Sequence, residues 1–142
     1  MPFGEYPYAV DDKGRVIVPP PFRMFVEHGM IITRGMEKCL YVFPVTAWSG
    51  VVKQLEALPM TDLKSRKFLR YFYSGAANAK LDGAGRITLP STLRTFAELE
   101  NSVMIAGAPN HLEIWNEQRW HDALEAMHDD LDAPELLQGM VG

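Results

Sequence analysis

An internal repeat constrains this chain more than any other feature, because two similar units must fold in equivalent ways. Residues 11–23 align with residues 82–94 at an offset of 71, and one extra residue in the second copy then moves the offset to 72. We therefore interpret the chain as one structural unit present twice. The identical pairs are Asp11/Asp82, Gly14/Gly85, Arg15/Arg86, Pro19/Pro90, Arg23/Arg94, Phe25/Phe96, Gly35/Gly107, Leu40/Leu112 and Trp48/Trp120.

Both units show the same order of expected elements. A short strand leads into an Asp-x-x-Gly-Arg turn, where Gly14 or Gly85 can adopt a positive φ. A β-rich run follows, and proline ends it because proline cannot donate to a sheet ladder. We then expect a short helix (22–28 with Gly29 as stop, 91–99 with Ser91 as N-cap), a hairpin (30–33 with 40–43, 103–106 with 112–115) and a longer helix with Thr46 or Asn116 as N-cap.

An additional helix is expected between the two units. Residues 61–73 combine apolar positions with a basic face, and Thr61 is the expected N-cap. Residues 74–78 are small and polar, as in a linker. The predicted organisation is a first repeat at 1–58, a connecting helix and linker at 59–79, a second repeat at 80–131 and a tail without periodic pattern at 132–142.

Neither unit is large enough to bury much apolar area by itself, since isolated hairpins are marginally stable in water. Interleaving the strands of both units into one closed sheet would give them a shared core and remove exposed sheet edges. We therefore expect a mainly β fold with flanking helices (α+β), in which the two units form one pseudo-two-fold β-barrel.

The charge distribution permits nucleic-acid binding although the net charge of the whole chain is −4. Residues 1–110 hold 13 Lys and Arg against 10 Asp and Glu, whereas residues 113–142 hold eight acidic residues and one arginine. Binding depends on the local field, so a mildly basic body can coexist with an acidic C-terminal segment. That segment is also typical of an ordinary solvated helix face.

Several features favour a cytoplasmic protein that does not associate with membranes. Cys39 is the single cysteine, which excludes an internal disulfide and indicates a buried thiol in a β-rich run. The first residues lack the charged start and apolar stretch of a secretory signal. No apolar run approaches the roughly 18–20 residues that a membrane-spanning helix needs.

The second repeat carries a family resemblance. Residues 81–94 read LDGAGRITLPSTLR, which resembles the Leu-Asp-x-x-Gly-Arg-Ile-x-Leu-Pro-x-x-Leu-Arg signature of the looped-hinge, AbrB-like DNA-binding fold. The tandem copies, the opening at residues 4–6 (GEY) and the segment 66–76 (RKFLRYFYSGA) narrow the resemblance to the MraZ family of bacterial transcriptional regulators. The likeness extends from residue 3 to about the terminal helix.

This resemblance implies two tandem swapped-hairpin units and a function. MraZ-like proteins form closed rings of protomers (octamer-like), bind repeated double-stranded promoter DNA, and repress their own operon in the division and cell-wall gene cluster. A nucleoid-associated location follows. The resemblance places the DNA-facing elements at Asp11 to Arg15 and at Asp82 to Arg86. This chain departs from the pattern at residues 19–21 (PPP), which are expected to delay the following helix, and at residue 84, where alanine replaces the lysine of the first repeat.

The residue types in the two turns suit DNA recognition. The guanidinium of Arg15 or Arg86, placed on a hairpin tip, offers a planar fork of donors for phosphate or a guanine edge. The aspartate four residues earlier can brace it, and Lys13 adds a charge for the DNA backbone. An Asp–Arg pair can instead serve only to stabilise its turn. The predicted DNA-binding residues are Asp11, Lys13, Gly14, Arg15, Asp82, Gly85 and Arg86.

Other positions leave more than one reading open. Arg23 and Arg94 are predicted to pair across the barrel, with secondary DNA contact as the alternative. The basic face of residues 61–73 can be a solvated helix surface, a protomer contact or a DNA contact. Tyr71, Phe72 and Tyr73 are either core residues or apolar surface for ring closure.

Nothing in the sequence favours an enzyme. We find no nucleotide-binding glycine loop, no paired carboxylates and no nucleophile–histidine arrangement, and expect no cofactor, resident metal or small-molecule substrate. His121 and His128 lie two helical turns apart with acidic neighbours, but their spacing matches no known ligand set. Two other functions remain alternatives: an AbrB-like antitoxin, and a ring-forming protein scaffold whose Asp–Arg turns are purely structural.

Overall fold

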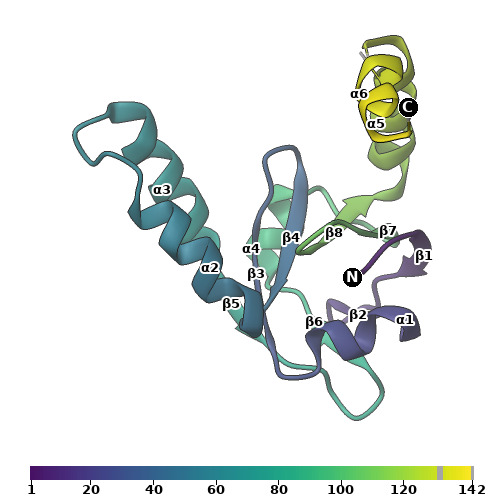
Figure 1. Cartoon of the computed structure of the whole chain (residues 1–142). Coiled ribbons are helices and arrows are strands. Elements are labelled where there is room, and N and C mark those ends of the chain that lie inside the picture. Colours follow the sequence, from purple (N-terminus) through teal and green to yellow (C-terminus); the bar gives the residue numbers. More distant parts are fainter. Residues whose placement is uncertain (131–132, 142) are drawn as a thin grey trace.

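The computed structural model describes residues 1–130 and 133–141 of the chain. Each repeat has two strands, a short helical segment, two more strands and a longer helix, in the order that the sequence predicts (Figure 1). The first repeat contains β1 (Glu5–Ala9), β2 (Arg15–Ile17), α1 (Pro20–Arg23), the 3₁₀ helix η1 (Met24–Val26), β3 (Met30–Arg34), β4 (Cys39–Pro44) and α2 (Val45–Glu56). After α3 (Leu63–Gly75) come β5 (Ala77–Ala79), β6 (Arg86–Thr88), α4 (Ser91–Phe96), β7 (Ser102–Gly107), β8 (Leu112–Asn116), α5 (Glu117–Asp130) and α6 (Ala133–Val141).

The strands of the two repeats are interleaved. Six of them form an antiparallel sheet in the order β1-β7-β8-β4-β3-β5, and β2 pairs with β6 in a separate two-stranded ribbon. Exchanging the repeats (β1 with β5, β3 with β7, β4 with β8) reproduces the same order, so a pseudo-two-fold axis passes between β4 and β8. The expected α+β class and the pseudo-symmetry are confirmed, but the fold is not mainly β, because the described helices, above all α2, α3 and α5, hold more residues than the strands. The swapped-hairpin description of each unit stays a prediction.

The expected closed barrel is wrong. Within the described residues the six-stranded sheet is open, because β1 pairs only with β7 and β5 only with β3. The turns that follow β1 and β5 direct the chain out of this sheet, so that β2 and β6 pair with each other. Closing the sheet would require β1 to pair with β5, and no such pairing forms between these two described strands.

The main core lies between the sheet and a second layer formed by the ribbon, α1, η1 and α4. Alternation along each strand sends every second side chain to this side. The sheet contributes fully buried aliphatic side chains from β3, β4, β7 and β8, and the second layer closes over them. The core residues are Val16, Val18, Phe22, Val26, Met30, Ile32, Leu40, Val42, Ile87, Leu89, Leu93, Ala97, Val103, Ile105, Leu112 and Ile114.

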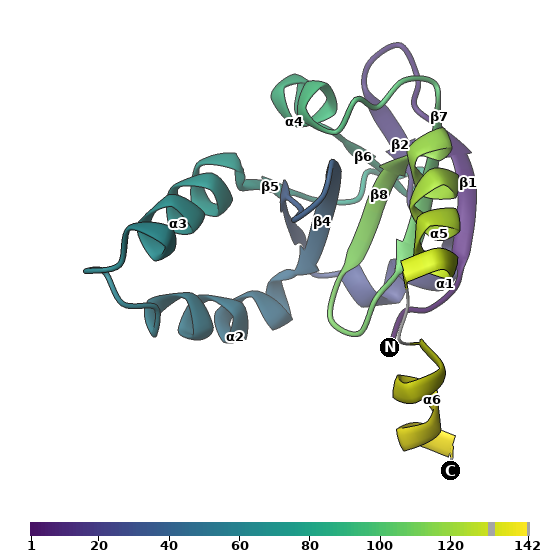
Figure 2. The same ribbon diagram turned by 90° about the horizontal axis from the view of Figure 1, so that it is seen from above.

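The remaining helices cover the opposite face of the sheet. The side chains that alternate with the main core on β4 contact α5 near Cys39 and contact α2 and α3 near Phe43. On this face α5 lies near β7 and β8, whereas α2 and α3 lie near β3 and β4 and extend away from that end of the sheet in both views (Figures 1 and 2). The ribbon lies on the main-core side of the sheet and the α2–α3 pair on the other side, so the two are on different surfaces of the molecule.

Helix boundaries differ from the sequence expectations where proline or a neighbouring residue decides them. The 19–21 prolines do not delay the first helix, because α1 begins at Pro20 and a first-turn proline lacks only an N–H that would have no partner. Asp62, not Thr61, caps α3 by accepting from the Ser65 N–H. Ser91 and Thr46 lie inside α4 and α2, whose N-caps are prolines without a side-chain cap.

Other local expectations are confirmed. Asn116 caps α5, since its Oδ1 accepts a hydrogen bond of 3.2 Å from the Arg119 N–H. Both predicted hairpins form, as β3–β4 and β7–β8, and Gly29 ends the first short helical segment with φ +110°. The tail is an exception, because residues 133–141 form α6 although the sequence shows no periodic pattern there. None of the helices in the described part of the chain is long and apolar enough to cross a bilayer.

Candidate nucleic-acid interface

Two equivalent turns carry the predicted site residues. In the first, the Gly14 N–H donates to Asp11 O (3.0 Å) and the Asp11 N–H donates to Arg15 O (2.9 Å). The second turn, from Asp82 to Arg86, repeats these bonds at 3.0 and 2.8 Å. The glycines have φ of +75° and +77°, a conformation that other residues adopt only with strain. Glycine is therefore required at both positions, as the repeat predicts.

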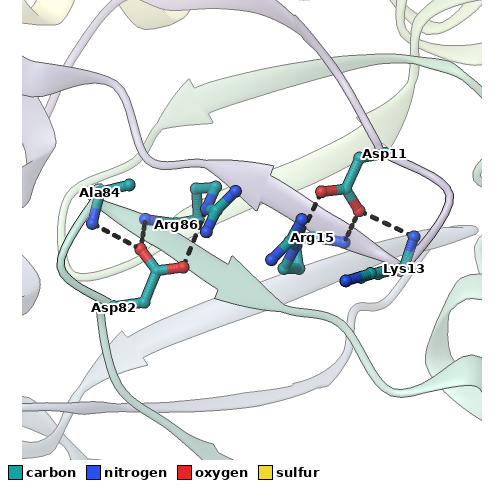
Figure 3. A network of polar contacts seen from close by, with 6 residues as sticks. All are labelled: Asp11, Lys13, Arg15, Asp82, Ala84 and Arg86. Atoms are coloured by element: carbon teal, nitrogen blue, oxygen red, sulfur yellow. Dashed lines mark hydrogen bonds and ion pairs between the residues drawn. The ribbon is translucent and has the colours of Figure 1, made fainter.

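Each aspartate fixes the arginine four residues later. Asp11 Oδ1 accepts from the backbone N–H groups of Lys13 (2.9 Å) and Arg15 (2.8 Å), while Oδ2 accepts from Arg15 Nε at 2.7 Å. The second turn repeats this arrangement around Asp82 with distances of 2.9, 2.8 and 2.8 Å (Figure 3). A carboxylate bonded to both the turn and the side chain holds the guanidinium in one direction.

The same bonds keep both carboxylates ionised. The pKa of Asp11 is lowered, chiefly by the hydrogen bond from the Arg15 backbone N–H and also by the Arg15 guanidinium. Both outweigh desolvation, which would raise the pKa. The backbone N–H and guanidinium of Arg86 lower the pKa of Asp82 in the same way. Each aspartate is therefore charged at neutral pH and pairs with the Nε edge of its arginine.

Arg15 and Arg86 lie on the outer face of the β2–β6 ribbon. Val16 and Ile87 are paired across the ribbon and point into the core, so the alternating positions point outward. The side chains of Arg15 and Arg86 are 28% and 33% exposed. Within residues 1–130 and 133–141, the terminal guanidinium nitrogens of both arginines form no hydrogen bond to the protein, and they remain available to a ligand.

The expected position of the arginines on a hairpin tip needs correction. β1 and β2 flank the first turn but do not pair, since β1 joins β7 and β2 joins β6. Arg15 faces Thr88, and Arg86 faces Ile17, so the two arginines are diagonal neighbours on one ribbon. Residues in such diagonal positions are roughly 7–8 Å apart, and their Cβ atoms are somewhat closer. The ribbon therefore joins into one surface two motifs that lie 71 residues apart in the sequence.

Arg23 and Arg94 link the repeats beneath this surface. The guanidinium of Arg94 packs on Gly14, and that of Arg23 packs on Gly85, so that a Cβ on either glycine would lie less than 3 Å from it. Their Nε atoms donate to Leu89 O (3.1 Å) and to Val18 O (3.0 Å). Each arginine thus binds the end of its own ribbon strand and supports the turn of the other repeat, as expected for a structural role across the two units.

The two turns differ in charge and in the residues beside their arginines. Lys13 is exposed in the first turn, and the equivalent Ala84 is exposed in the second. Ile17 and Thr88 complete the outer face of the ribbon and are both exposed. Sequence reasoning did not identify these two residues as part of the site, although their alternation with Val16 and Ile87 would have placed them beside the arginines.

The basic face of α3 lies elsewhere. Lys64, Lys67 and Arg70 are exposed on this helix, which packs on β3 through the opposite face of the sheet from the ribbon. In both views α3 is separated from β2 and β6 (Figures 1 and 2). Phe72 is buried, Tyr71 is half-buried with its hydroxyl donating to Gly35 O, and only Tyr73 is exposed. Core packing therefore accounts for most of the aromatic run.

Comparison with known proteins also divides the chain into its two repeats. A family model described as "MraZ protein, putative antitoxin-like" matches residues 1–71 and again residues 72–136. The chain belongs to the MraZ family. It is 57% identical to the transcriptional regulator MraZ of Deinococcus radiodurans over 99% of both chains, and 54% identical to that of Thermus thermophilus over the full length of both. The MraZ protein of Halothermothrix orenii is 40% identical over 93% of this chain and 92% of its own.

MraZ membership agrees with the resemblance seen in the sequence, and the relatives are named as regulators of transcription, not as enzymes. Among the described residues, no three His, Cys, Asp or Glu side chains are grouped to hold a metal ion. His121 lies on α5 with Glu117 nearby, while the His128 side chain falls outside the described residues. Cys39 is completely buried, as predicted.

Proposed function

We propose that this MraZ-family chain is a sequence-specific DNA-binding transcriptional regulator that contacts double-stranded DNA through the β2–β6 ribbon. The observation that carries the proposal is the pair of aspartate-braced arginines on the ribbon's outer face. A two-stranded ribbon fits the major groove, where a guanidinium can donate to both O6 and N7 of guanine. The names of the relatives support the regulatory role.

The spacing of the two ribbon positions that carry Arg15 and Arg86 suits a short base sequence. Diagonal ribbon positions roughly 7–8 Å apart correspond to about two base-pair steps of roughly 3.4 Å. The hydrogen bonds that Arg15 and Arg86 donate to Asp11 and Asp82 fix each guanidinium before binding, which lowers the entropy cost of ordering it. Lys13, exposed beside Arg15, supplies a further charge for a phosphate.

A single ribbon is a weak reader, since one good arginine–guanine pair contributes about 1–3 kcal/mol of discrimination. Linking identical ribbons in a closed, octamer-like ring raises the affinity for repeated sites by orders of magnitude when the spacing matches. Closure needs a head-to-tail contact between different patches of neighbouring protomers. In this proposal the ring represses its own operon, in the division and cell-wall gene cluster, and acts in the cytoplasm at the nucleoid.

The test compares Arg15→Ala and Arg86→Ala with Arg70→Ala, which removes the same charge from exposed α3. DNA from upstream of the chain's own gene is titrated at several salt concentrations. We expect the ribbon variants to keep the circular dichroism and assembly size of the natural protein but to lose specific binding, and Arg70→Ala to bind normally. Specific affinity should also fall steeply with salt.

Three results would contradict the proposal. Unchanged affinity in both ribbon variants would remove the arginines from the interface. Loss of binding only in Arg70→Ala would place the interface on α3. A natural protein that shows neither sequence preference nor salt dependence would favour the scaffold alternative.

An antitoxin-like role is the second candidate, favoured by the description of the family model and by α6. Leu136, Leu137 and Met140 on this helix are exposed apolar side chains, as in a segment that docks on a protein partner. Removing α6 would then abolish toxin neutralisation while leaving DNA binding by the ribbon intact.

A further inference from the structure

The outer face of the β2–β6 ribbon carries four side chains, and only two of them are arginines. Ile17 and Thr88 occupy the positions directly opposite Arg86 and Arg15. Ile17 is 37% exposed, although isoleucine usually lies inside a protein. Its neighbours Val16 and Val18 are almost completely buried, so the ribbon has apolar residues for its inner face and does not need Ile17 to hold it on the core.

The backbone that presents these four side chains is the same in both repeats. Arg15 pairs with Thr88, and Arg86 pairs with Ile17. The residue after each ribbon strand donates a backbone hydrogen bond to the glycine of the other repeat's turn. The Val18 N–H donates to Gly85 O at 2.9 Å, and the Leu89 N–H donates to Gly14 O at 2.8 Å. Any functional difference between the two halves of the ribbon therefore comes from side chains and not from geometry.

The side chains divide the ribbon into two chemically different halves. One half combines Arg15 with the hydroxyl of Thr88, which can donate or accept a hydrogen bond at a base edge. The other combines Arg86 with the aliphatic side chain of Ile17, which can make only apolar contacts. In the major groove the C5-methyl group of thymine is the apolar feature that such a side chain contacts.

We propose that Ile17 and Thr88 are specificity-determining residues and that their difference makes each ribbon read an asymmetric base sequence in one orientation. The proposal rests on DNA binding by the ribbon. Arg15 and Arg86 supply two equivalent contacts, Ile17 selects thymine beside the contact of Arg86, and Thr88 gives a different preference beside the contact of Arg15. A ribbon with the same residue at both positions would lack this direction.

The test selects preferred sites from randomised duplexes with four proteins: the natural chain, Ile17→Thr, Thr88→Ile, and the double exchange Ile17→Thr with Thr88→Ile. The two single variants make the outer face identical on both strands. We expect them to select a sequence without direction between the two arginine contacts. In the single variants the preference should change roughly tenfold at the affected base pairs. The double exchange should select the natural duplex again, because both halves share one backbone geometry and exchanging the two residues is equivalent to turning the ribbon by 180°, so that it reads the same duplex from the other strand.

Lys13→Ala is the matched control from the same surface. A phosphate contact positions the protein but carries no base information, so this variant should bind all sequences more weakly with the natural preference unchanged. It should also reduce the slope of log affinity against log salt concentration by about one. A changed base preference in Lys13→Ala together with an unchanged one in both single variants would overturn the proposal.

A second measurement uses only the natural protein. Uracil replaces each thymine of the selected site in turn, which removes the C5-methyl group and leaves base pairing intact. We expect a several-fold loss of affinity at one thymine beside the Arg86 contact, and no such loss at any thymine would overturn the role of Ile17. Specific binding with an unaltered asymmetric preference in both single variants refutes this proposal alone, whereas absence of any DNA binding by the natural chain refutes DNA binding as well.

Discussion

Gly85→Ala tests the physical reason why the turn that carries Arg86 folds as it does. Gly85 has φ +77°, where an L-residue costs about 1–2 kcal/mol. The new Cβ would also lie 2.6 Å from Cζ and 2.8 Å from Nε of Arg23. The Arg23 side chain must then move and give up its hydrogen bond to Val18 O, and bonds from charged groups contribute about 1.5–3 kcal/mol.

These effects add to a destabilisation of about 1.5–4.5 kcal/mol after allowing roughly 0.4–1 kcal/mol for the lower entropy of the unfolded alanine chain. For a chain of 142 residues we expect the midpoint of thermal unfolding to fall by roughly 5–15 °C. Gly83→Ala is the matched control two residues away, because a Cβ there meets no atom within 4 Å and Gly83 does not have a positive φ.

Thermal and denaturant unfolding followed by circular dichroism measure the difference, and the Arg23→Ala background separates its two causes. Without the Arg23 side chain, Gly85→Ala should cost only about 1 kcal/mol, since the positive φ remains and the close contact is gone. Equal unfolding midpoints for Gly85→Ala and Gly83→Ala would refute the reasoning. An undiminished cost in the Arg23→Ala background would refute the part assigned to the arginine.

Two further predictions concern groups away from the ribbon. Burial, with smaller contributions from the charges of Glu113 and Glu37, raises the pKa of the Cys39 thiol, so a chromogenic thiol reagent should label Cys39 only under denaturing conditions; rapid labelling of the folded protein would contradict this. Burial alone would raise the pKa of Glu113, but hydrogen bonds from His111 and Trp115 outweigh it and lower the pKa. The stability that this carboxylate contributes is then complete above its ordinary pKa near 4.5 and is lost as the pH falls through the lower folded value. Glu113→Gln should flatten the pH dependence of the unfolding free energy in this acidic range, and an unchanged pH profile would show that the carboxylate is not responsible.

The sequence alone established the features that depend on short stretches of chain. The repeat, the two hairpins, the glycine turns and the Asn116 cap all follow from residue types whose conformational preferences act locally. The candidate site was likewise identified as two Asp-x-x-Gly-Arg motifs. Helix starts were less predictable, because Asp62 and Thr61 are adjacent and both are good N-caps, and the surrounding structure chooses between them.

The tertiary structure decided how the two motifs combine. A sequence with two copies of one unit specifies that their strands can pair, but not whether the joint sheet closes. Pairing between repeats depends on which backbone groups meet after the chain has folded, and here β2 and β6 leave the sheet and bond to each other. That choice brings Arg15, Arg86, Ile17 and Thr88 to one face, because antiparallel partners point to the same side of a ribbon and their sequence separation has no influence on it.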